Sequence, residues 1–269
     1  MIIDSHTHIG KISFPVGKNR VSNLKKEDLL SALNKYQIDI ALVSSIEGAE
    51  FDSESKLVSE DMQIPQILVM ERTIDFVRRH PTKLKALLWI KPFTEGYDDQ
   101  IEKIIRDNRE FIAGFKVHPS LSNLPLFDQK YQPYFELASK FQLPIQIHTE
   151  NDGKSNVKYV NDIAQMFSEI SFVMVHMGLG SDNSEAINLI HKRDNLYGDT
   201  CEVETKRILK AIEVVGSKKL LFGTDAVVYG INTYERYLPM IKVIREKFSE
   251  DQVNNILGQN CIRIYQNIF

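Results

Sequence analysis

The chain has 269 residues, of which 43% are hydrophobic and 26% are charged, a composition typical of ordered proteins with a sizeable core. Its formal net charge of −3 and isoelectric point near 6.2 provide no basic footprint for a nucleic-acid backbone. Two cysteines cannot build a disulfide framework, and neither a signal-peptide pattern nor an apolar run of membrane-spanning length occurs, so we expect a cytoplasmic protein.

Short runs rich in Val, Ile, Leu and Phe alternate along the chain with amphipathic stretches of helical length. This alternation is typical of βα units and a parallel sheet. We expect eight strands, at residues 1–5, 39–44, 84–90, 111–117, 144–148, 171–176, 195–199 and 219–223.

The helices are predicted from apolar residues spaced three and four positions apart. The first two stripes run from Leu24 to Tyr36 and from Ile64 to Val77, and Pro81 ends the second, because the residue before a proline is disfavoured in a helix. Further helices are expected at residues 97–106, 131–141, 157–167, 185–191, 203–214 and 234–247, and an additional one at 252–265 follows the last strand.

No linker or low-complexity segment divides this series. We therefore predict an α/β fold, a (β/α)8 TIM barrel formed by one domain over residues 1–269, with an extra C-terminal helix. An open doubly wound sheet is less favoured, because no glycine-rich phosphate loop follows the first strand.

The histidines concentrate at one end of the predicted barrel. Side chains alternate along a strand, so Asp4, His6 and His8 are expected on one face. Of the seven histidines, five lie at predicted carboxyl ends of strands, where barrel enzymes carry their active sites: His6, His8, His118, His148 and His176. The other two, His80 and His191, fall in helices and are not site candidates.

With His6-x-His8 on the first strand, histidines ending the fifth and sixth strands, and Gly223-Thr224-Asp225 ending the eighth, the whole chain resembles the amidohydrolase superfamily. It looks most like the branch that contains aminocarboxymuconate semialdehyde decarboxylase. The closing "ILGQNCIRIY" is similar to the family's C-terminal helix.

The resemblance implies one divalent metal ion, usually zinc, bound by His6, His8, His148 and Asp225, with His176 facing the reacting group. Nitrogen and carboxylate ligands of this kind suit zinc, and iron or manganese would also be accepted. Relatives with two metals carry a carboxylated lysine or a glutamate on the fourth strand. Here that strand offers Lys116 and His118, which favours one metal.

A bound metal lowers the pKa of its water towards about 7, so a nucleophile exists without serine or cysteine. Asp225 is the predicted proton carrier between water and leaving group. His176 would polarise the substrate or act as acid or base, and binding a second ion is its alternative role.

Lys116 and His118 are predicted to contact a substrate carboxylate. For Lys116 an equal alternative is neutralisation of buried carboxylates such as Asp4. Asp199 and Cys201 end the seventh strand and are expected to line the site. The long segments 46–62 and 119–130 are expected to cover it.

The sequence therefore predicts an amidohydrolase-type enzyme that hydrolyses an amide, ester or lactone bond in a small, carboxylate-bearing substrate. The alternative is nonoxidative decarboxylation or hydration of an unsaturated or aromatic acid on the same metal centre. Phosphodiester cleavage is less favoured, because related nucleases carry a glutamate on the fourth strand, and a metal-binding protein without turnover remains a further option. A small molecule is the expected partner, without nucleic acid or membrane, and a homodimer is left open.

Overall fold

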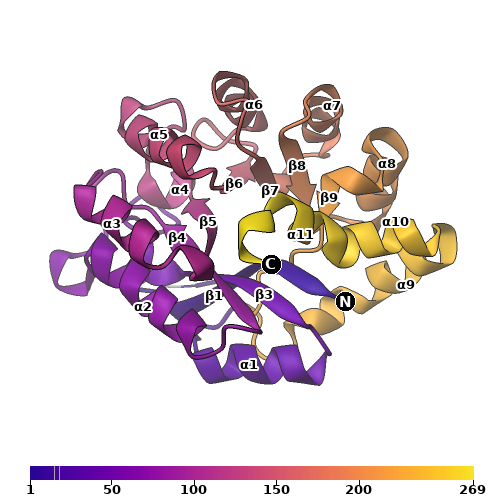
Figure 1. Ribbon diagram of the computed structural model, residues 1–269, viewed down its shortest axis with the longest axis horizontal. Coiled ribbons are helices and arrows are strands. Elements are labelled where there is room, and N and C mark those ends of the chain that lie inside the picture. Colours follow the sequence, from indigo (N-terminus) through magenta and orange to yellow (C-terminus); the bar gives the residue numbers. More distant parts are fainter. Residues whose placement is uncertain (15, 18) are drawn as a thin grey trace.

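The predicted barrel is confirmed by a computed structural model that describes residues 1–14, 16–17 and 19–269. One curled sheet has the strand order β2-β1-β3-β4-β5-β6-β7-β8-β9 (Figure 1). The parallel strands are β1 (Ile3–Lys11), β3 (Ile40–Ser45), β4 (Leu84–Trp89), β5 (Ile112–Val117), β6 (Ile145–Glu150), β7 (Phe172–Leu179), β8 (Leu196–Asp199) and β9 (Leu220–Leu221). The short β2 (Asn23–Leu24) pairs antiparallel with the end of β1.

The barrel closes where the segment after β9 meets β1. The amide of Ser5 donates to the carbonyl of Phe222 (2.8 Å), and the amide of Asp225 donates to the carbonyl of His6 (2.9 Å). Residues from the two ends of the sequence thus share one seam.

Helices surround the sheet in Figure 1 and cover its outer face. They are α1 (Lys26–Lys35), α2 (Gln66–Arg78), α3 (Asp99–Asp107), α5 (Gln132–Phe141), α6 (Val157–Met166), α7 (Ser184–Lys192), α8 (Thr205–Val215) and α9 (Leu238–Lys247). The segment 119–130 also contains a short helix that sequence patterns did not indicate, α4 (Pro119–Ser122), with proline in its first turn. No helix within the described part of the chain is long and apolar enough to cross a membrane.

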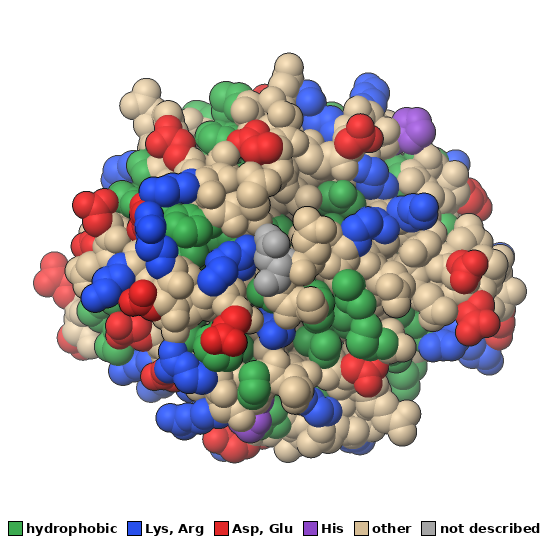
Figure 2. Space-filling model, in the orientation of Figure 1, with side chains coloured by type: hydrophobic (Ala, Val, Ile, Leu, Met, Phe, Trp, Pro, Cys, Tyr) green, Lys and Arg blue, Asp and Glu red, His purple; other side chains and the backbone are tan. Residues whose placement is uncertain are grey.

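The predicted C-terminal helix is present and consists of α10 (Glu250–Asn254), a π-helical turn (Asn255–Gln259) and α11 (Asn260–Ile264). Its last part lies across the amino-terminal opening of the barrel (Figure 1). There Cys261, Ile264 and Tyr265 pack on the first interior residues of the strands, among them Ile3 and Leu87. Seen from this side, basic and acidic side chains are interspersed over the surface (Figure 2). The packing of α11 therefore closes the amino-terminal end of the barrel, and the candidate site residues lie at the opposite end.

The first strand differs from the prediction in length and in the face that Asp4 occupies. It extends to Lys11 because His8 and Ile9 continue the pairing with Ser44 and Ser45, and the register shifts between Asp4 and Thr7. A bulge of this kind breaks the simple alternation of side chains. The carboxylate of Asp4 consequently accepts hydrogen bonds from Thr224 and Tyr234, so the prediction that it shares a face with His6 and His8 was wrong.

The packing of α11 on the strands predicts that a substitution there lowers stability. Replacing Ile264, which is 8% exposed in this cluster, by alanine should lower the free energy of unfolding by about 2–5 kcal/mol, since a cavity is left between α11 and the strands. Urea denaturation measures it. Ile231→Ala, at a position 38% exposed, is the matched control, and an equal loss in both variants would contradict the packing role.

Candidate metal centre

Three potential ligand atoms converge at the seam between β1 and the segment after β9. The Nε2 atoms of His6 and His8 lie 3.1 Å apart. Each also faces the same carboxylate oxygen, Oδ1 of Asp225, at 3.0 Å and 3.2 Å. The sequence prediction that His6, His8 and Asp225 lie together is met by this arrangement, which we call the ligand triangle.

The opposite edge of each imidazole is fixed by a buried polar group. His6 Nδ1 lies 3.0 Å from Oδ2 of Asp199, and His8 Nδ1 lies 2.9 Å from the hydroxyl of Ser44. A carboxylate can only accept, so His6 carries a proton on Nδ1, and Nε2 is the nitrogen left to bind a metal in the triangle. Asp199 also accepts from the backbone amide of His176 (2.8 Å), and therefore orients two strands at once.

The triangle fits a metal ion. Ring nitrogens with lone pairs and a carboxylate oxygen repel one another at 3 Å unless a proton or a cation lies among them. For tetrahedral ligands bonded at 2.0–2.1 Å, the spacing between ligand atoms is about 3.3 Å, close to the spacings seen. Lys116, whose Nζ lies 2.8 Å from Nε2 of His6, adds positive charge beside the triangle.

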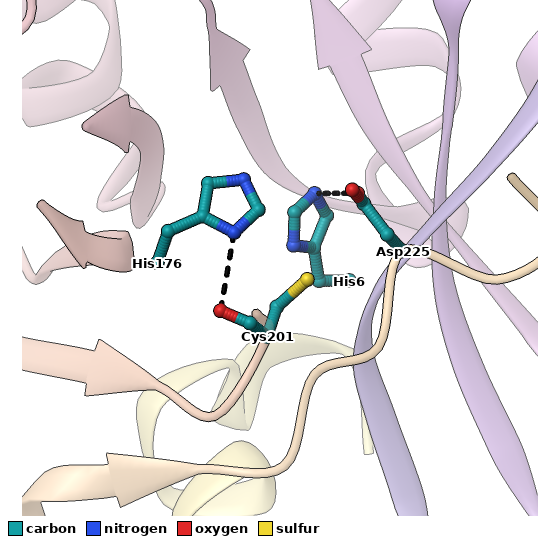
Figure 3. Close-up of side chains that lie close together, drawn as sticks. All are labelled: His6, His176, Cys201 and Asp225. Atoms are coloured by element: carbon teal, nitrogen blue, oxygen red, sulfur yellow. Dashed lines mark hydrogen bonds and ion pairs between the residues drawn. The ribbon is translucent and has the colours of Figure 1, made fainter. Parts of the chain in front are cut away.

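His176 and Cys201 stand beside the triangle. One potential ligand atom each from His6, His176, Cys201 and Asp225 lies within 4.8 Å of the others (Figure 3). Nδ1 of His176 is 3.2 Å from the backbone carbonyl of Cys201, so Nδ1 carries the proton and Nε2 can accept a proton or bind a metal. The structure therefore places Cys201 next to the site, at the position where its place at the end of the seventh strand predicted a lining residue.

His148 is turned differently from the prediction. Its Nε2 lies 2.6 Å from Oε1 of Glu150, and its ring stands edge-on to that of His176, with ring centres 4.8 Å apart. A role for His148 as metal ligand thus stays a prediction, since this nitrogen would have to leave Glu150.

The two residues predicted to contact substrate separate in the structure. Lys116 is fully buried and faces Asp225 and Asp199, while burial lowers its pKa to about 8. This position suits the alternative role of neutralising buried carboxylates, with Asp199 and Asp225 in place of Asp4. His118 instead lines a cavity above the triangle.

That cavity has a volume of about 300 Å³ and lies at the carboxyl ends of the strands. Its polar wall includes His8, His118, His148, His176 and Asp225, and its apolar wall includes Ile12, Phe14, Ile46, Leu121, Leu179 and Val228. The predicted covering segments contribute Asp52, Ser53, Ser55 and Ser120. They contact each other, because the amides of Glu50 and Phe51 both donate to the carbonyl of Leu121.

Burial holds most of the imidazoles neutral. It lowers the pKa of His8 to about 4 and those of His148 and His176 to about 3, and neutral imidazole is the form that binds metals. Asp225 has a pKa well below its usual range, because the attraction and hydrogen bonds of His6 and His8 outweigh burial.

Replacing Asp199 by asparagine should weaken zinc binding by about tenfold to a hundredfold. An amide can donate to Nδ1 of His6, which moves the ring proton to Nε2 and blocks the triangle. Competition with a zinc-binding dye measures the affinity. Asp182→Asn, at an exposed acid, should bind zinc like the unmodified protein, and equal affinity in Asp199→Asn would contradict the orienting role.

Replacing His148 by glutamine should change the acid sensitivity of the metal-free protein. The unfolded chain binds a proton at His148 below about pH 6.5, whereas the folded chain does so only near the lowered pKa of about 3. This histidine therefore makes the free energy of unfolding fall as the pH falls from 6.5 towards 5. Without it, the slope in this window should decrease by about 1.4 kcal/mol per pH unit. Urea titrations at several pH values test it, with His191→Gln as the exposed control. An unchanged slope in His148→Gln would contradict a neutral buried ring.

Comparisons with known proteins agree with this fold. A family model described as Amidohydrolase matches residues 71–266, and a search of curated proteins finds no match. Among solved structures, the chain is similar to 5-carboxyvanillate decarboxylase from Sphingomonas paucimobilis, with 15% identity, a TM-score of 0.71 and 98% of each chain covered.

Two further similar structures contain metals. Dihydroxybenzoic acid decarboxylase from Polaromonas sp. JS666, with bound manganese and the inhibitor 2-nitroresorcinol, shares 13% identity at a TM-score of 0.73, over 98% of this chain and 96% of that one. An amidohydrolase from Burkholderia multivorans with bound zinc shares 10% identity at a TM-score of 0.73, over 99% of both. At these identities the likeness concerns the fold. Since the family model covers well over half of the sequence, the protein belongs to the amidohydrolase family.

Proposed function

We propose that the protein is a metal-dependent enzyme that removes carbon dioxide nonoxidatively from a small aromatic or unsaturated carboxylic acid. The observation that carries this proposal is the ligand triangle of His6, His8 and Asp225 beneath a cavity with apolar walls. Two of the similar structures named above are decarboxylases of aromatic acids, which favours this reaction over hydrolysis.

The residues present fit one divalent cation, zinc or manganese, held by His6, His8 and Asp225, with His148 or His176 as a further ligand. When bound, such an ion supplies positive charge that attracts the oxygens of an acid and stabilises charge developing in the reaction. The rest of the chemistry falls to the chain's own groups.

The cavity can hold a flat substrate. Phe14, Leu121 and Val228 belong to its wall, and about 300 Å³ is at the lower end of the range for small-molecule sites. The apolar wall contacts the ring or double bond, so that the carboxyl end points to the triangle.

The reaction breaks the bond between the substrate carbon and its carboxyl group, and the electron pair stays on that carbon, which must then gain a proton. We assign the proton transfer to Asp225, which lines the cavity and faces both histidines. Asp225 is ionised at rest, because its pKa lies well below its usual range, so it first takes one proton from solvent in the cavity and then gives that proton to the carbon as carbon dioxide leaves. Nε2 of His176 is placed as an acceptor, because its Nδ1 proton is held by Cys201.

Hydrolysis of an amide, ester or lactone is the second candidate. It is favoured by the family description and by the same Asp225, which would then take a proton from water. Both candidates use the same ligands and differ in the bond that breaks.

The test incubates the zinc- or manganese-loaded protein with a panel of hydroxybenzoic and unsaturated acids, and separately with amides, esters and lactones. We expect carbon dioxide release and a protonated product, and loss of turnover to the blank rate in His6→Ala. His191→Ala, far from the site on the exposed side of α7, should turn over normally. Hydrolysis products without carbon dioxide would select the second candidate, and unchanged turnover in His6→Ala would contradict both.

A further inference from the structure

His118 is held on three sides, which leaves one edge of its ring exposed to the cavity. One face stacks on His148, with ring centres 3.7 Å apart and planes inclined by 12°, and the other stacks on Trp89 at 5.6 Å and 26°. At its edge, Nδ1 accepts the backbone amide of Leu121 at the start of α4 (3.3 Å). The ring can neither flip nor tilt without losing these contacts.

These contacts also fix where the ring proton sits. Since Nδ1 accepts a hydrogen bond from Leu121, it carries no proton in the neutral ring, and the proton lies on Nε2. Burial and the neighbouring His148 and Lys116 keep the pKa of His118 well below its usual value, so the ring is neutral. His118 and His176 are thus opposite tautomers: the free nitrogen of His118 donates, and that of His176 accepts.

The part of the chain that the structure describes offers no acceptor to this donor. Among the described residues no hydrogen-bond partner is found for Nε2 of His118, and the residue lines the cavity. Because this N–H group is already oriented, little free energy is lost to reorganisation when it binds an oxygen that enters the cavity.

The charged side chains of the cavity wall indicate what kind of oxygen the His118 N–H group would bind. Each carboxylate of the wall already has a partner within the chain: Asp52 with the amide of Glu54, Glu150 with His148, Asp152 with Ser155, Glu202 with Arg236, and Asp225 with the two triangle histidines. The two cations of the wall, Arg20 and Lys154, have no carboxylate within 4.0 Å in the described part of the chain. Arg20 and Lys154 are thus the positively charged side chains of this wall that an entering anion can approach.

We propose that His118 is a specificity-determining residue whose Nε2–H donates to a carboxylate oxygen of the substrate. This inference rests on the proposed function for the identity of the substrate, but it concerns binding, which can be measured without turnover. Of the two residues that the sequence predicted at a substrate carboxylate, it assigns this role to His118, since Lys116 is buried beneath the cavity.

Two substitutions test the roles of the two ring nitrogens of His118 separately. In His118→Asn, the side-chain oxygen can still accept from Leu121, but the donor to the cavity is lost. In His118→Gln, the longer amide can still donate into the cavity, but the acceptor for Leu121 is lost. The probe is benzoate, with benzamide as its uncharged counterpart, titrated calorimetrically into the zinc-loaded protein.

We expect His118→Asn to weaken benzoate binding by about tenfold to a hundredfold, the usual effect of losing a hydrogen bond to a charged group, with a melting temperature close to that of the unmodified protein. His118→Gln should bind benzoate within about threefold of normal, while its melting temperature falls by a few degrees, because the N-cap of α4 is lost. Benzamide should bind weakly and respond little to either change.

A second measurement needs no variant. Nitrogen NMR of the imidazoles in the zinc-loaded protein should show His118 protonated on Nε2. A proton on Nδ1, normal benzoate affinity in His118→Asn, an equal loss in both variants, or no benzoate binding to the unmodified protein would each overturn the proposal. Benzoate binding that depends on His118, without carbon dioxide release from any acid, would support this inference and reject only the proposed reaction.

Discussion

The site depends on one interaction, the meeting of two imidazole nitrogens and one carboxylate oxygen at about 3 Å where the barrel closes. His6 and His8 come from the first strand and Asp225 from the segment after the last. The backbone bond between Asp225 and His6 joins these segments directly. Closure of the barrel and assembly of the ligand triangle are therefore the same event, and any change that opens this seam separates the ligands.

Asp199 extends this constraint to a third part of the chain. One of its oxygens holds His6, and the other accepts the backbone amide of His176. The backbone of β7 is unusual at this point, since His176 and Met177 both have positive φ, 65° and 48°, which costs energy for residues other than glycine. Asn183 stabilises it by donating to both carbonyls. Strain at this position is offset by bonds that aim His176 at the triangle.

Much of the architecture could be predicted from the sequence because it depends on local patterns. Short apolar runs and helical spacing predicted the strands and helices closely, and the strand ends placed His6, His8 and Asp225 at one rim. The face of Asp4 could not be predicted, since a bulge in β1 arises from pairing with β3. The burial of Lys116 likewise depends on neighbours distant in sequence, and the orientation of the His148 ring towards Glu150 depends on side-chain packing that strand spacing does not specify. Asp199 had a signal, its position at a strand end, but its bond to His6 links residues 193 positions apart.

The tautomers of the histidines decide which ring nitrogens of the site accept and which donate. Carboxylate and carbonyl acceptors fix protons on the outer nitrogens of His6 and His176, whereas a backbone amide fixes the opposite arrangement in His118. Lone pairs consequently point to the triangle and an N–H points to the cavity. Residue type alone does not carry this information, because each ring nitrogen can play either part.

The most direct test of the account is the anomalous scattering of crystals grown with zinc or manganese. The account predicts one peak within bonding distance of Nε2 of His6, Nε2 of His8 and Oδ1 of Asp225. No peak at that position at saturating metal, or a peak held instead by Glu150 and Asp152, would contradict it.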